Sequence, residues 1–558
     1  MAPINVHIKH VGKNHDIHLD PDLPPLAFKE AIYQVTGVPV DRMKVMIKGG
    51  VLKDDTPWKK ISPKEGQTFM VIGAAGELPK PPEKPILFLE DMDDSELAEA
   101  LAKPVGLSNL GNTCYMNATI QALRAVPELQ IALNAPSLPV GSPLPNSLRD
   151  LYKNMSRTTE SVNPTKFLEV LRQINPQFAE RDRGGKGTGG YSQQDAEECY
   201  SQIINSLRPI PGIPSTKPVA STKSFVEQYL MGEMRRTMTC DEAPDEPPSV
   251  MTEKVLKIEC NITGTTNFML AGLKNALDTT LEKNSPSLGR EATYSQKSRL
   301  TRLPTYLTVH MVRFAWRADI GKKAKIMRKV KFPTEFDALD IVTDELKSKL
   351  LPVSRRLMEL EKERSERRKV RKRTKVIGGP SSSTDANKDI EMADISSTPA
   401  STSEPAPESQ SNEQKGTIPG DLEDEAVYRQ RELAELEGLV DPELKQDVGS
   451  SVSGLYELVA IVTHKGAAAD AGHYIGFVKK SVFHSMHGKP PVLTEEPEAS
   501  GSSSPPKKSP EFDESDEDWY KFDDEKVSIF PKEKLASLDG GGEDSSAYVL
   551  LYRSKPLA

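Results

Sequence analysis

The sequence predicts an α+β protein with a small N-terminal domain (residues 1–76), a linker (77–104) and a large C-terminal domain (105–555). Apolar residues alternate as in β-strands around one helical stretch within the first 72 residues. Proline and acidic residues dominate the linker. Beyond it, helical periodicity up to about residue 205 gives way to β-type apolar runs.

The composition excludes several classes of protein. A formal net charge of -8 argues against a nucleic-acid binder, and no apolar run reaches the roughly 18 residues that a membrane span needs. No charged-then-apolar leader follows Met1. The 4 cysteines, Cys114, Cys199, Cys240 and Cys260, are too scattered for a disulfide framework, as is typical of a reducing compartment. We therefore expect a cytoplasmic and nuclear protein with no membrane or nucleic-acid partner.

Two strands and a helix open the N-terminal domain. Phe28, Ile32 and Val35 recur at i, i+4 and i+7, which predicts a helix that ends at Gly37. Apolar runs at 45–47 and 69–72 supply later strands. The paired strands before the helix alternate at Ile4, Val6, Ile8, Ile17 and Leu19. This order of elements resembles ubiquitin and predicts a β-grasp fold.

The resemblance to ubiquitin implies a docking surface. In ubiquitin-like domains the sheet carries an apolar patch for receptors, and Met46 and Ile72 align with it here; ordinary surface or core positions are the alternative. The domain ends in GAAG at 73–76 and the chain continues, so it has no free Gly-Gly terminus. We therefore expect it to dock on a receptor rather than to be conjugated.

The linker and the start of the large domain hold two further features. A short helix is expected at about 95–102. A glycine-rich run at 184–190 then interrupts the helical part of the domain. Such a run cradles phosphate when a β-strand precedes it and a Lys-Ser/Thr pair follows, and neither is present. We interpret it as a flexible loop that faces substrate.

The stretch GLSNLGNTCYMN at 106–117 places a cysteine where a loop becomes a helix. Amides at a helix N-terminus lower the pKa of a thiol, and the thiolate is the reactive form, so Cys114 is a candidate nucleophile. The amide of Asn109 and the backbone N–H of Cys114 are candidate donors to an oxyanion. The alternative for Cys114 is a small buried hydrophobic residue.

Two later stretches offer the partners that a nucleophilic thiol needs. His473 opens a β-type run after a loop of small residues, and Asp523 and Asp524 lie at the end of another. A lone strand histidine is more often packed or solvated, and an acidic pair is by default a solvated turn. With Cys114, however, they supply the nucleophile, the general base and the orienting carboxylate of a thiol hydrolase.

Five segments resemble the signature boxes of the ubiquitin-specific protease family, in the family's order. They are GLSNLGNTCYMNATIQAL at 106–123, YSQQDAEE at 191–198, LPTYLTVHMVRF at 303–314, AGHYIGFVK at 471–479 and WYKFDDEKVS at 519–528. The resemblance covers most of residues 105–555. It implies a papain-like cysteine peptidase domain with thumb, palm and fingers, whose partners are ubiquitin and ubiquitinated proteins.

The resemblance also implies catalytic roles. Cys114 attacks the carbonyl of the ubiquitin C-terminal glycine, His473 transfers protons, and Asn109 stabilises the oxyanion. Asp523 orients the imidazole, because the family's triad carboxylate directly follows the aromatic residue of its box. Asp524 is the rival carboxylate, since the sequence does not decide which side chain points inward.

Recognition of substrate and partners follows from the same resemblance. Gln194 and Asp195 match positions that meet the ubiquitin tail, although Asp195 is equally explained as a helix N-cap. Tyr474 is expected to wall a channel that admits only side-chain-free glycines. The ubiquitin-like domain implies docking on the proteasome regulatory particle. We expect a deubiquitinating enzyme at the proteasome, with a catalytically silent ubiquitin-binding proteasome regulator as the alternative.

The sequence departs from the family in its fingers region. Many members hold a zinc there with two Cys-x-x-Cys pairs, whose spacing suits tetrahedral thiolate ligation. Here Cys240 and Cys260 stand alone, and no Cys-x-x-Cys occurs. We therefore expect no metal and no cofactor, and we expect Cys199 and Cys260 to be buried and inert.

Polar inserts divide the large domain. A solvated helix is expected for the basic cluster at 367–373, with a nuclear signal or an electrostatic contact as alternatives. Residues 378–421 and 483–517 are too polar to bury a core and are expected to be disordered. A helix near 428–438 and a last strand at 547–552 return the chain to the folded domain.

Overall fold

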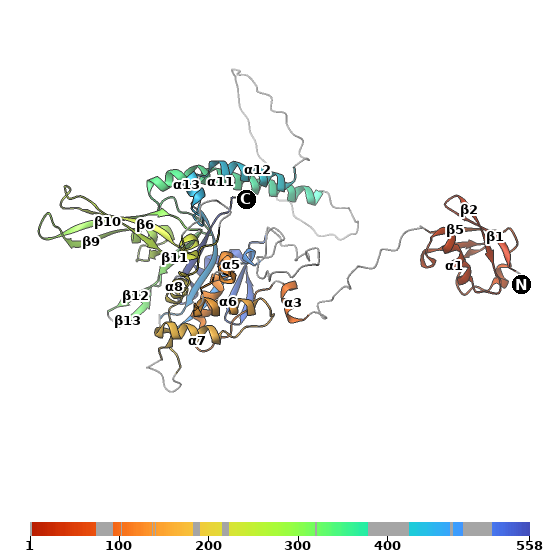
Figure 1. Cartoon of the computed structure of the whole chain (residues 1–558), viewed down its shortest axis with the longest axis horizontal. Coiled ribbons are helices and arrows are strands. Elements are labelled where there is room, and N and C mark those ends of the chain that lie inside the picture. The colour runs from red at the N-terminus through yellow and green to blue at the C-terminus, as the bar shows by residue number, and fades with distance from the viewer. Residues whose placement is uncertain are drawn as a thin grey trace, which may run out of the picture. The chain divides into compact units, whose positions relative to one another are not determined.

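The computed structural model divides the chain into two compact units, Met1–Asp91 and Met92–Ala558 (Figure 1). The structure describes residues 3–73, 93–101, 103–136, 138–139, 141–181, 190–214, 223–318, 321–377, 423–468, 472–483 and 516–557. The predicted insert at 378–421, most of the insert at 483–517 and most of the glycine-rich run at 184–190 therefore lie outside the described residues.

Unit 1 is a β-grasp domain, as predicted. Helix α1 (Pro25–Thr36) packs on a sheet of strand order β2-β1-β5-β3-β4, in which β1 and β5 run parallel. The other elements are β1 (Ile4–His10), β2 (Lys13–Leu19), β3 (Lys44–Ile47), β4 (Gly50–Val51), α2 (Trp58–Ile61) and β5 (Thr68–Ile72). Edge-to-face contacts of Phe28 with Trp58 and Phe69, at centroid distances of 5.6 and 5.5 Å, lie in its core.

The end of the helix in unit 1 is predicted correctly, but one of the three residues predicted for its buried face is exposed. Gly37 ends α1 in the left-handed region, with φ 70°. Phe28 and Ile32 are buried as expected, but Val35 is 45% exposed. Val35 lies in the last turn, and the buried Val38 beyond Gly37 occupies the core instead.

The first part of unit 2 is helical, which confirms the prediction for residues up to about 205. Its helices are α3 (Asp94–Leu101), α4 (Cys114–Leu123), α5 (Pro127–Asn134), α6 (Pro143–Met155), α7 (Thr165–Ile174) and α8 (Ala196–Leu207). Every residue of α4 is buried, because α8 contacts it on one side and strand β16 on another.

The main sheet of unit 2 has the order β18-β17-β16-β15-β19-β11-β8, and β14 also pairs with β15. The strands are β8 (Ile258–Asn261), β11 (Tyr306–Val312), β14 (Glu335–Asp337), β15 (Leu455–Lys465), β16 (His473–Lys479), β17 (Trp519–Asp523), β18 (Lys526–Phe530) and β19 (Ser546–Ser554). Strand β19 includes the predicted last strand and lies between β15 and β11.

A second sheet projects from this core (Figure 1). We call it the projecting sheet, and its strand order is β7-β6-β10-β9. Its strands are β6 (Gly232–Cys240), β7 (Ser249–Val255), β9 (Asp278–Asn284) and β10 (Glu291–Arg302). The same region contains helices α9 (Phe225–Tyr229) and α10 (Met269–Leu277) and the paired strands β12 (Phe314–Arg317) and β13 (Lys322–Lys325).

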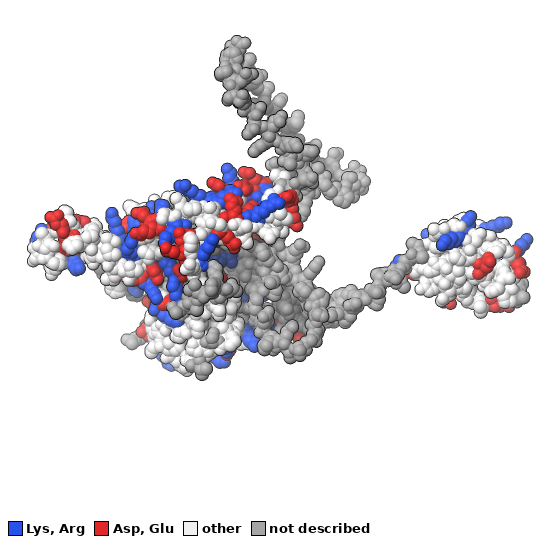
Figure 2. Space-filling view, turned by 45° about the horizontal axis from the view of Figure 1, so that its top comes forward, with Lys and Arg blue, Asp and Glu red and all other residues white. Residues whose placement is uncertain are grey.

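Helices α11 (Asp344–Ile377), α12 (Glu425–Leu439) and α13 (Pro442–Gln446) form a helical arm. Leu357 and Leu360 of α11 share a buried cluster with Leu436 of α12. Figure 2 shows acidic and basic side chains interspersed over the face that α11 and α12 form. Among the described residues, no helix is both long and apolar enough to cross a membrane.

The expected solvated form of the basic cluster at 367–373 is wrong for Arg367. Its side chain is only 12% exposed and pairs with Glu432 of α12. Glu432 also accepts a hydrogen bond from Arg364 at 2.6 Å, and Glu425 pairs with Arg371 at 3.2 Å. These arginines are therefore partners of a second helix, which the local charge pattern does not reveal.

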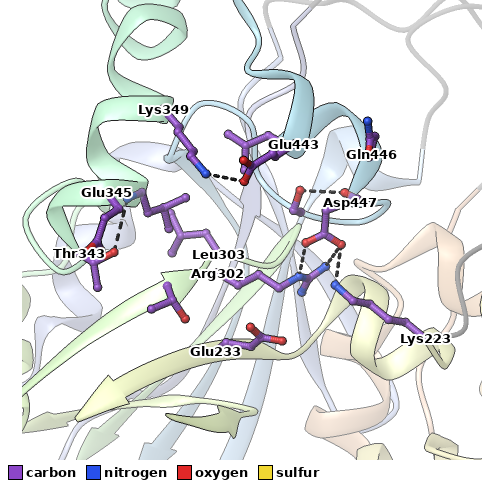
Figure 3. Close-up of a pocket in the computed structure, with 14 residues that line it drawn as sticks. Lys223, Glu233, Arg302, Leu303, Thr343, Glu345, Lys349, Glu443, Gln446 and Asp447 are labelled. Carbon is purple, nitrogen blue, oxygen red and sulfur yellow. Dashed lines mark hydrogen bonds and ion pairs between the residues drawn. The ribbon is translucent and has the colours of Figure 1, made fainter. Parts of the chain in front are cut away.

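The helical arm meets the projecting sheet around a cavity of about 570 Å³ (Figure 3). Asp447, directly after α13, accepts hydrogen bonds from Arg302 at 2.6 Å and from Lys223 at 2.7 Å. Lys349 of α11 pairs with Glu443 of α13 at 2.5 Å. These ion pairs cross-link the elements around the cavity, so we interpret it as a structural junction.

Replacing Asp447 by alanine should destabilise the protein by about 2 kcal/mol, because the buried guanidinium of Arg302 loses its charged partner. The loss is smaller than for a fully buried ion pair, since the Asp447 side chain is 23% exposed and Arg302 keeps the carbonyl oxygens of Met231 and Gln228 as acceptors. Urea unfolding of the wild type and Asp447→Ala measures it. Glu443→Ala is the control, because Glu443 is 77% exposed and such pairs contribute little. Equal effects of the two variants would contradict the junction.

Candidate active site

Cys114 is the first residue of α4, which confirms the predicted start of this helix. Gly111 and Asn112 in the preceding turn are left-handed, with φ 91° and 54°. The Oδ1 atom of Asn109 holds this turn by accepting hydrogen bonds from the backbone N–H groups of Gly111 (3.0 Å) and Thr113 (3.3 Å). The thiol thus lies at the N-terminus of a buried helix, where backbone N–H groups without a partner inside the helix attract negative charge.

His473 is the first residue of β16, and the packing of β16 on α4 brings it to Cys114. The backbone N–H of Tyr474 donates to the Cys114 sulfur at 3.4 Å. Gly476 permits this approach, because a Cβ there would lie 3.2 Å from the carbonyl oxygen of Ala118. Two residues 359 positions apart therefore meet where the helix and the strand both begin.

Asp523 is the last residue of β17, the neighbour of β16. One carboxylate oxygen of Asp523 lies 2.6 Å from His473 Nε2, and the other accepts a hydrogen bond from Lys521 Nζ at 3.0 Å. The nearest oxygen of Asp524 is 4.0 Å from the same imidazole nitrogen. The structure therefore places Asp523, and not Asp524, within hydrogen-bond distance of the imidazole.

Asp524 instead organises the segment around Cys114. Its two carboxylate oxygens accept hydrogen bonds from the side-chain amides of Asn117 and Asn109, both at 2.8 Å. Its backbone oxygen accepts one from Leu107 N at 3.0 Å. An asparagine amide has two hydrogens, so Asn109 keeps one N–H for another acceptor. Sequence reasoning missed Asn117, which is one of three buried polar residues in α4, together with Thr119 and Gln121.

The hydrogen bonds at the site favour a protonated imidazole beside an ionised carboxylate. Hydrogen bonds with Cys114 and Asp523 raise the pKa of His473 to about 9, against the opposing effect of burial. Burial alone would raise the pKa of Asp523, but hydrogen bonds from His473 and Lys521 hold that pKa below its ordinary value. At neutral pH His473 is therefore protonated and Asp523 ionised.

The predicted substrate-binding residues Asp195 and Tyr474 converge on Tyr548. Asp195 is the N-cap of α8, where its Oδ1 accepts a hydrogen bond from Glu197 N at 2.7 Å, and its Oδ2 accepts one from the Tyr548 hydroxyl. Burial raises the pKa of Asp195. The ring of Tyr474 lies 6.0 Å from that of Tyr548, and Gln194 is buried directly before Asp195.

Two histidines that sequence reasoning missed, the buried His464 and the half-buried His310, pack against these tyrosines. The ring of His464 lies 4.8 Å from Tyr474, and that of His310 lies 5.0 Å from Tyr548. Burial lowers the pKa of His464 to about 4, so it is neutral at physiological pH. Both histidines lie inside apolar strands, where a lone histidine carries no functional signal of its own.

The environments of Cys199 and Cys260 do not favour a reactive thiolate. Cys199 and Cys260 are buried, as expected. Burial raises the pKa of Cys260 to about 12, so it is not a thiolate at neutral pH. Within the described part of the chain, potential metal-ligand atoms of three side chains come within 4.8 Å of one another only at His473, Asp523 and Asp524.

The two predicted receptor-binding residues lie on exposed positions of the sheet in unit 1. Met46 of β3 is 36% exposed and Ile72 of β5 is 52% exposed. Met70, which sequence reasoning missed, lies directly opposite Met46 and is 52% exposed. The alternation of β5 places Met70 and Ile72 on one face, so the three side chains form an exposed apolar patch.

Known proteins resemble both units. Residues 105–552 match the family described as "Ubiquitin carboxyl-terminal hydrolase" and residues 4–75 match the ubiquitin family. "Ubiquitin carboxyl-terminal hydrolase 6" of Schizosaccharomyces pombe is 37% identical over 556 residues, which cover 100% of both chains. Its namesake in Arabidopsis thaliana is 34% identical, over 97% of this chain and 96% of its own. A solved structure of the SAGA Ubp8/Sgf11/Sus1/Sgf73 DUB module bound to ubiquitin aldehyde is 16% identical, with a TM-score of 0.46, over 84% of this chain and 73% of that one.

The raised pKa of His473 predicts how the thiol reacts. The imidazolium is fully present below pH 6.5 and is lost as the pH rises through about 9, so it should support the Cys114 thiolate at neutral pH. His473→Ala should slow alkylation of Cys114 by iodoacetamide at pH 7 by roughly tenfold, because an unassisted thiol is then mostly protonated. Alkylation rates from pH 5 to 10 measure this, with Cys114→Ala for the background. Superimposable pH profiles would rule the ion pair out.

Proposed function

This chain belongs to the ubiquitin carboxyl-terminal hydrolase family, and we propose that it removes ubiquitin from conjugated proteins at the proteasome. It is a thiol-dependent ubiquitinyl hydrolase that acts on ubiquitin and ubiquitinated proteins. One observation supports action at the proteasome: a single chain contains both a hydrolase domain and a ubiquitin-like domain with an exposed apolar patch. We place this activity in the cytoplasm and the nucleus.

We assign the chemistry to Cys114, His473 and Asp523. The thiolate of Cys114 attacks the carbonyl carbon of the ubiquitin C-terminal glycine, and the C–N bond breaks as His473 gives its proton to the leaving amine. Water then attacks the thioester carbonyl while His473 takes one of the water's protons, and the C–S bond breaks. The product acid loses its proton to solvent, and the thiolate and the imidazolium are restored. The 2.6 Å contact of Asp523 with His473 supports its role in orienting the imidazole.

We assign stabilisation of the substrate oxyanion to the side-chain amide of Asn109 and the backbone N–H of Cys114. One amide hydrogen of Asn109 is bound by Asp524 at 2.8 Å, and the second N–H is the donor to the tetrahedral oxygen. Held at both its Oδ1 and its Nδ2, Asn109 loses little freedom when the charge develops, which is the condition for electrostatic stabilisation. Asp524 is thus a positioning residue for Asn109.

We assign recognition of the ubiquitin tail to Gln194, Asp195 and Tyr474. Tyr474 supports this because its backbone N–H already contacts the Cys114 sulfur. The rings of His464 and Tyr548 pack against the ring of Tyr474 and hold it in place, and we infer that Tyr474 walls a narrow passage to the thiol. A narrow passage of this kind selects glycines, which have no side chain to exclude.

A ubiquitin C-terminal electrophile probe tests the enzymatic assignment. The wild type should be labelled in the presence of proteasomes, and Cys114→Ala should not. Cys199→Ala is the matched control, because Cys199 is a buried cysteine whose pKa is raised by burial. A protein that is never labelled, yet still changes proteasome activity, would favour the catalytically silent regulator instead.

Deleting residues 1–76 should abolish binding to proteasomes while leaving hydrolysis by the free enzyme intact. Met46, Met70 and Ile72 are removed by this change, whereas every catalytic residue lies in unit 2. Co-sedimentation with purified proteasomes and hydrolysis of a fluorogenic ubiquitin conjugate measure the two effects. In the full chain, Met46→Ala with Ile72→Ala should weaken binding about tenfold, as loss of a binding hot spot does. Wild-type binding by the truncated protein would exclude docking through this domain.

A further inference from the structure

Hydrogen bonds to carboxylates, chiefly that of Glu246, hold the far end of the projecting sheet together. Glu246 lies in the loop between β6 and β7, and its oxygens accept hydrogen bonds from the hydroxyl groups of Ser285, Ser287 and Tyr294, each at 2.7 Å. The two serines belong to the turn between β9 and β10, and Tyr294 lies in β10. Glu246 therefore ties together the two loops at this end of the sheet.

Neighbouring contacts reinforce the same connection. Glu242 accepts a hydrogen bond from the backbone N–H of Thr293 at 2.8 Å and pairs with Arg290 at 2.8 Å. The apolar cluster beneath the loops has only Cys240, Ala292 and Tyr294 as buried members. A cluster of this size does not fix two loops by hydrophobic burial alone, so their arrangement depends on the polar contacts.

Glu246 meets its donors as a charged group. Hydrogen bonds from Ser285, Tyr294 and Ser287 lower the pKa of Glu246 to about 2, so it is ionised throughout the neutral range. Hydrogen bonds to an ionised acceptor are shorter and stronger than neutral ones. Among the described residues, this end of the sheet has no group of potential metal ligands.

We propose that Glu246 is a positioning residue for substrate, acting as a metal-free clamp that shapes the end of the projecting sheet for contact with the folded body of ubiquitin. The inference rests on the proposed function. The sheet extends away from the main sheet that carries His473 (Figure 1), so a substrate contact at its end would lie far from the scissile bond. Val250 and Met251 follow Glu246 along the chain in β7 and are 58% and 61% exposed, so each face of the sheet offers one apolar contact.

Steady-state kinetics on a ubiquitin–fluorophore conjugate test the clamp. Glu246→Ala should raise KM about tenfold with kcat unchanged, because the clamp acts on substrate binding and not on the reacting atoms. Glu246→Gln keeps an acceptor oxygen and should raise KM less. Glu282→Ala is the matched control, since Glu282 is an exposed carboxylate on β9 of the same sheet. A short fluorogenic peptide ending in Gly-Gly should be hydrolysed equally by all four proteins.

The outcomes separate this inference from the proposed function. A wild type that does not cleave the conjugate refutes the function, whereas equal KM values for wild type and Glu246→Ala refute the clamp alone.

Two further measurements test the clamp itself. In Glu246→Ala, backbone hydrogen exchange should become faster only at 241–248 and 285–291. A chelator should leave the KM of the wild type unchanged, and a rise in that KM would overturn a metal-free clamp. If Glu246→Ala does not fold, Ser287→Ala decides, because it removes one exposed donor: a KM raised about twofold supports the clamp, and an unchanged KM overturns it.

Discussion

The active site depends on the close packing of helix α4 against strand β16. The thiol is on the first residue of the helix and the imidazole on the first residue of the strand, so their separation is set by backbone packing. Glycines keep that packing close. A Cβ at Gly476 would lie 3.2 Å from the carbonyl oxygen of Ala118, and one at Gly106 would lie 2.5 Å from the carbonyl oxygen of Asp524. Each substitution would displace backbone rather than a flexible side chain, and would therefore move a catalytic group.

Two adjacent carboxylates serve different parts of this arrangement. Asp523 ends β17 and contacts the imidazole, whereas Asp524 is left-handed, with φ 52°, and binds the amides of Asn109 and Asn117. The change in backbone conformation between neighbours lets one strand end hold both His473, the proposed base, and Asn109, the proposed oxyanion donor. A shift of this strand end would therefore displace His473 and Asn109 together.

Local patterns predicted those features whose cause is local. The start of α4 at Cys114, the β-grasp order and the end of α1 at Gly37 follow from periodicity, helix termini and glycine geometry. Long-range pairs were not predictable, because the partners of Asp447, Glu432 and Asp524 lie 145, 65 and 407 residues away. No spacing rule connects such positions. The exposure of Val35 likewise depends on how the chain continues after the helix.

The contacts of Asp447 and Glu246 weaken as the pH falls, whereas the contact of the His473 imidazolium weakens as the pH rises. Despite burial, hydrogen bonds from Arg302 and Lys223 lower the pKa of Asp447, and three hydroxyl groups lower that of Glu246 to about 2. Their contributions are present above the ordinary carboxyl pKa and are lost as the pH falls below it. His473 is the reverse case, since its raised pKa adds stability below pH 6.5 that disappears through about pH 9. Acid therefore weakens the hydrogen bonds of Asp447 and Glu246, and base removes the proton from His473, so all of these contacts are intact together only between the two limits.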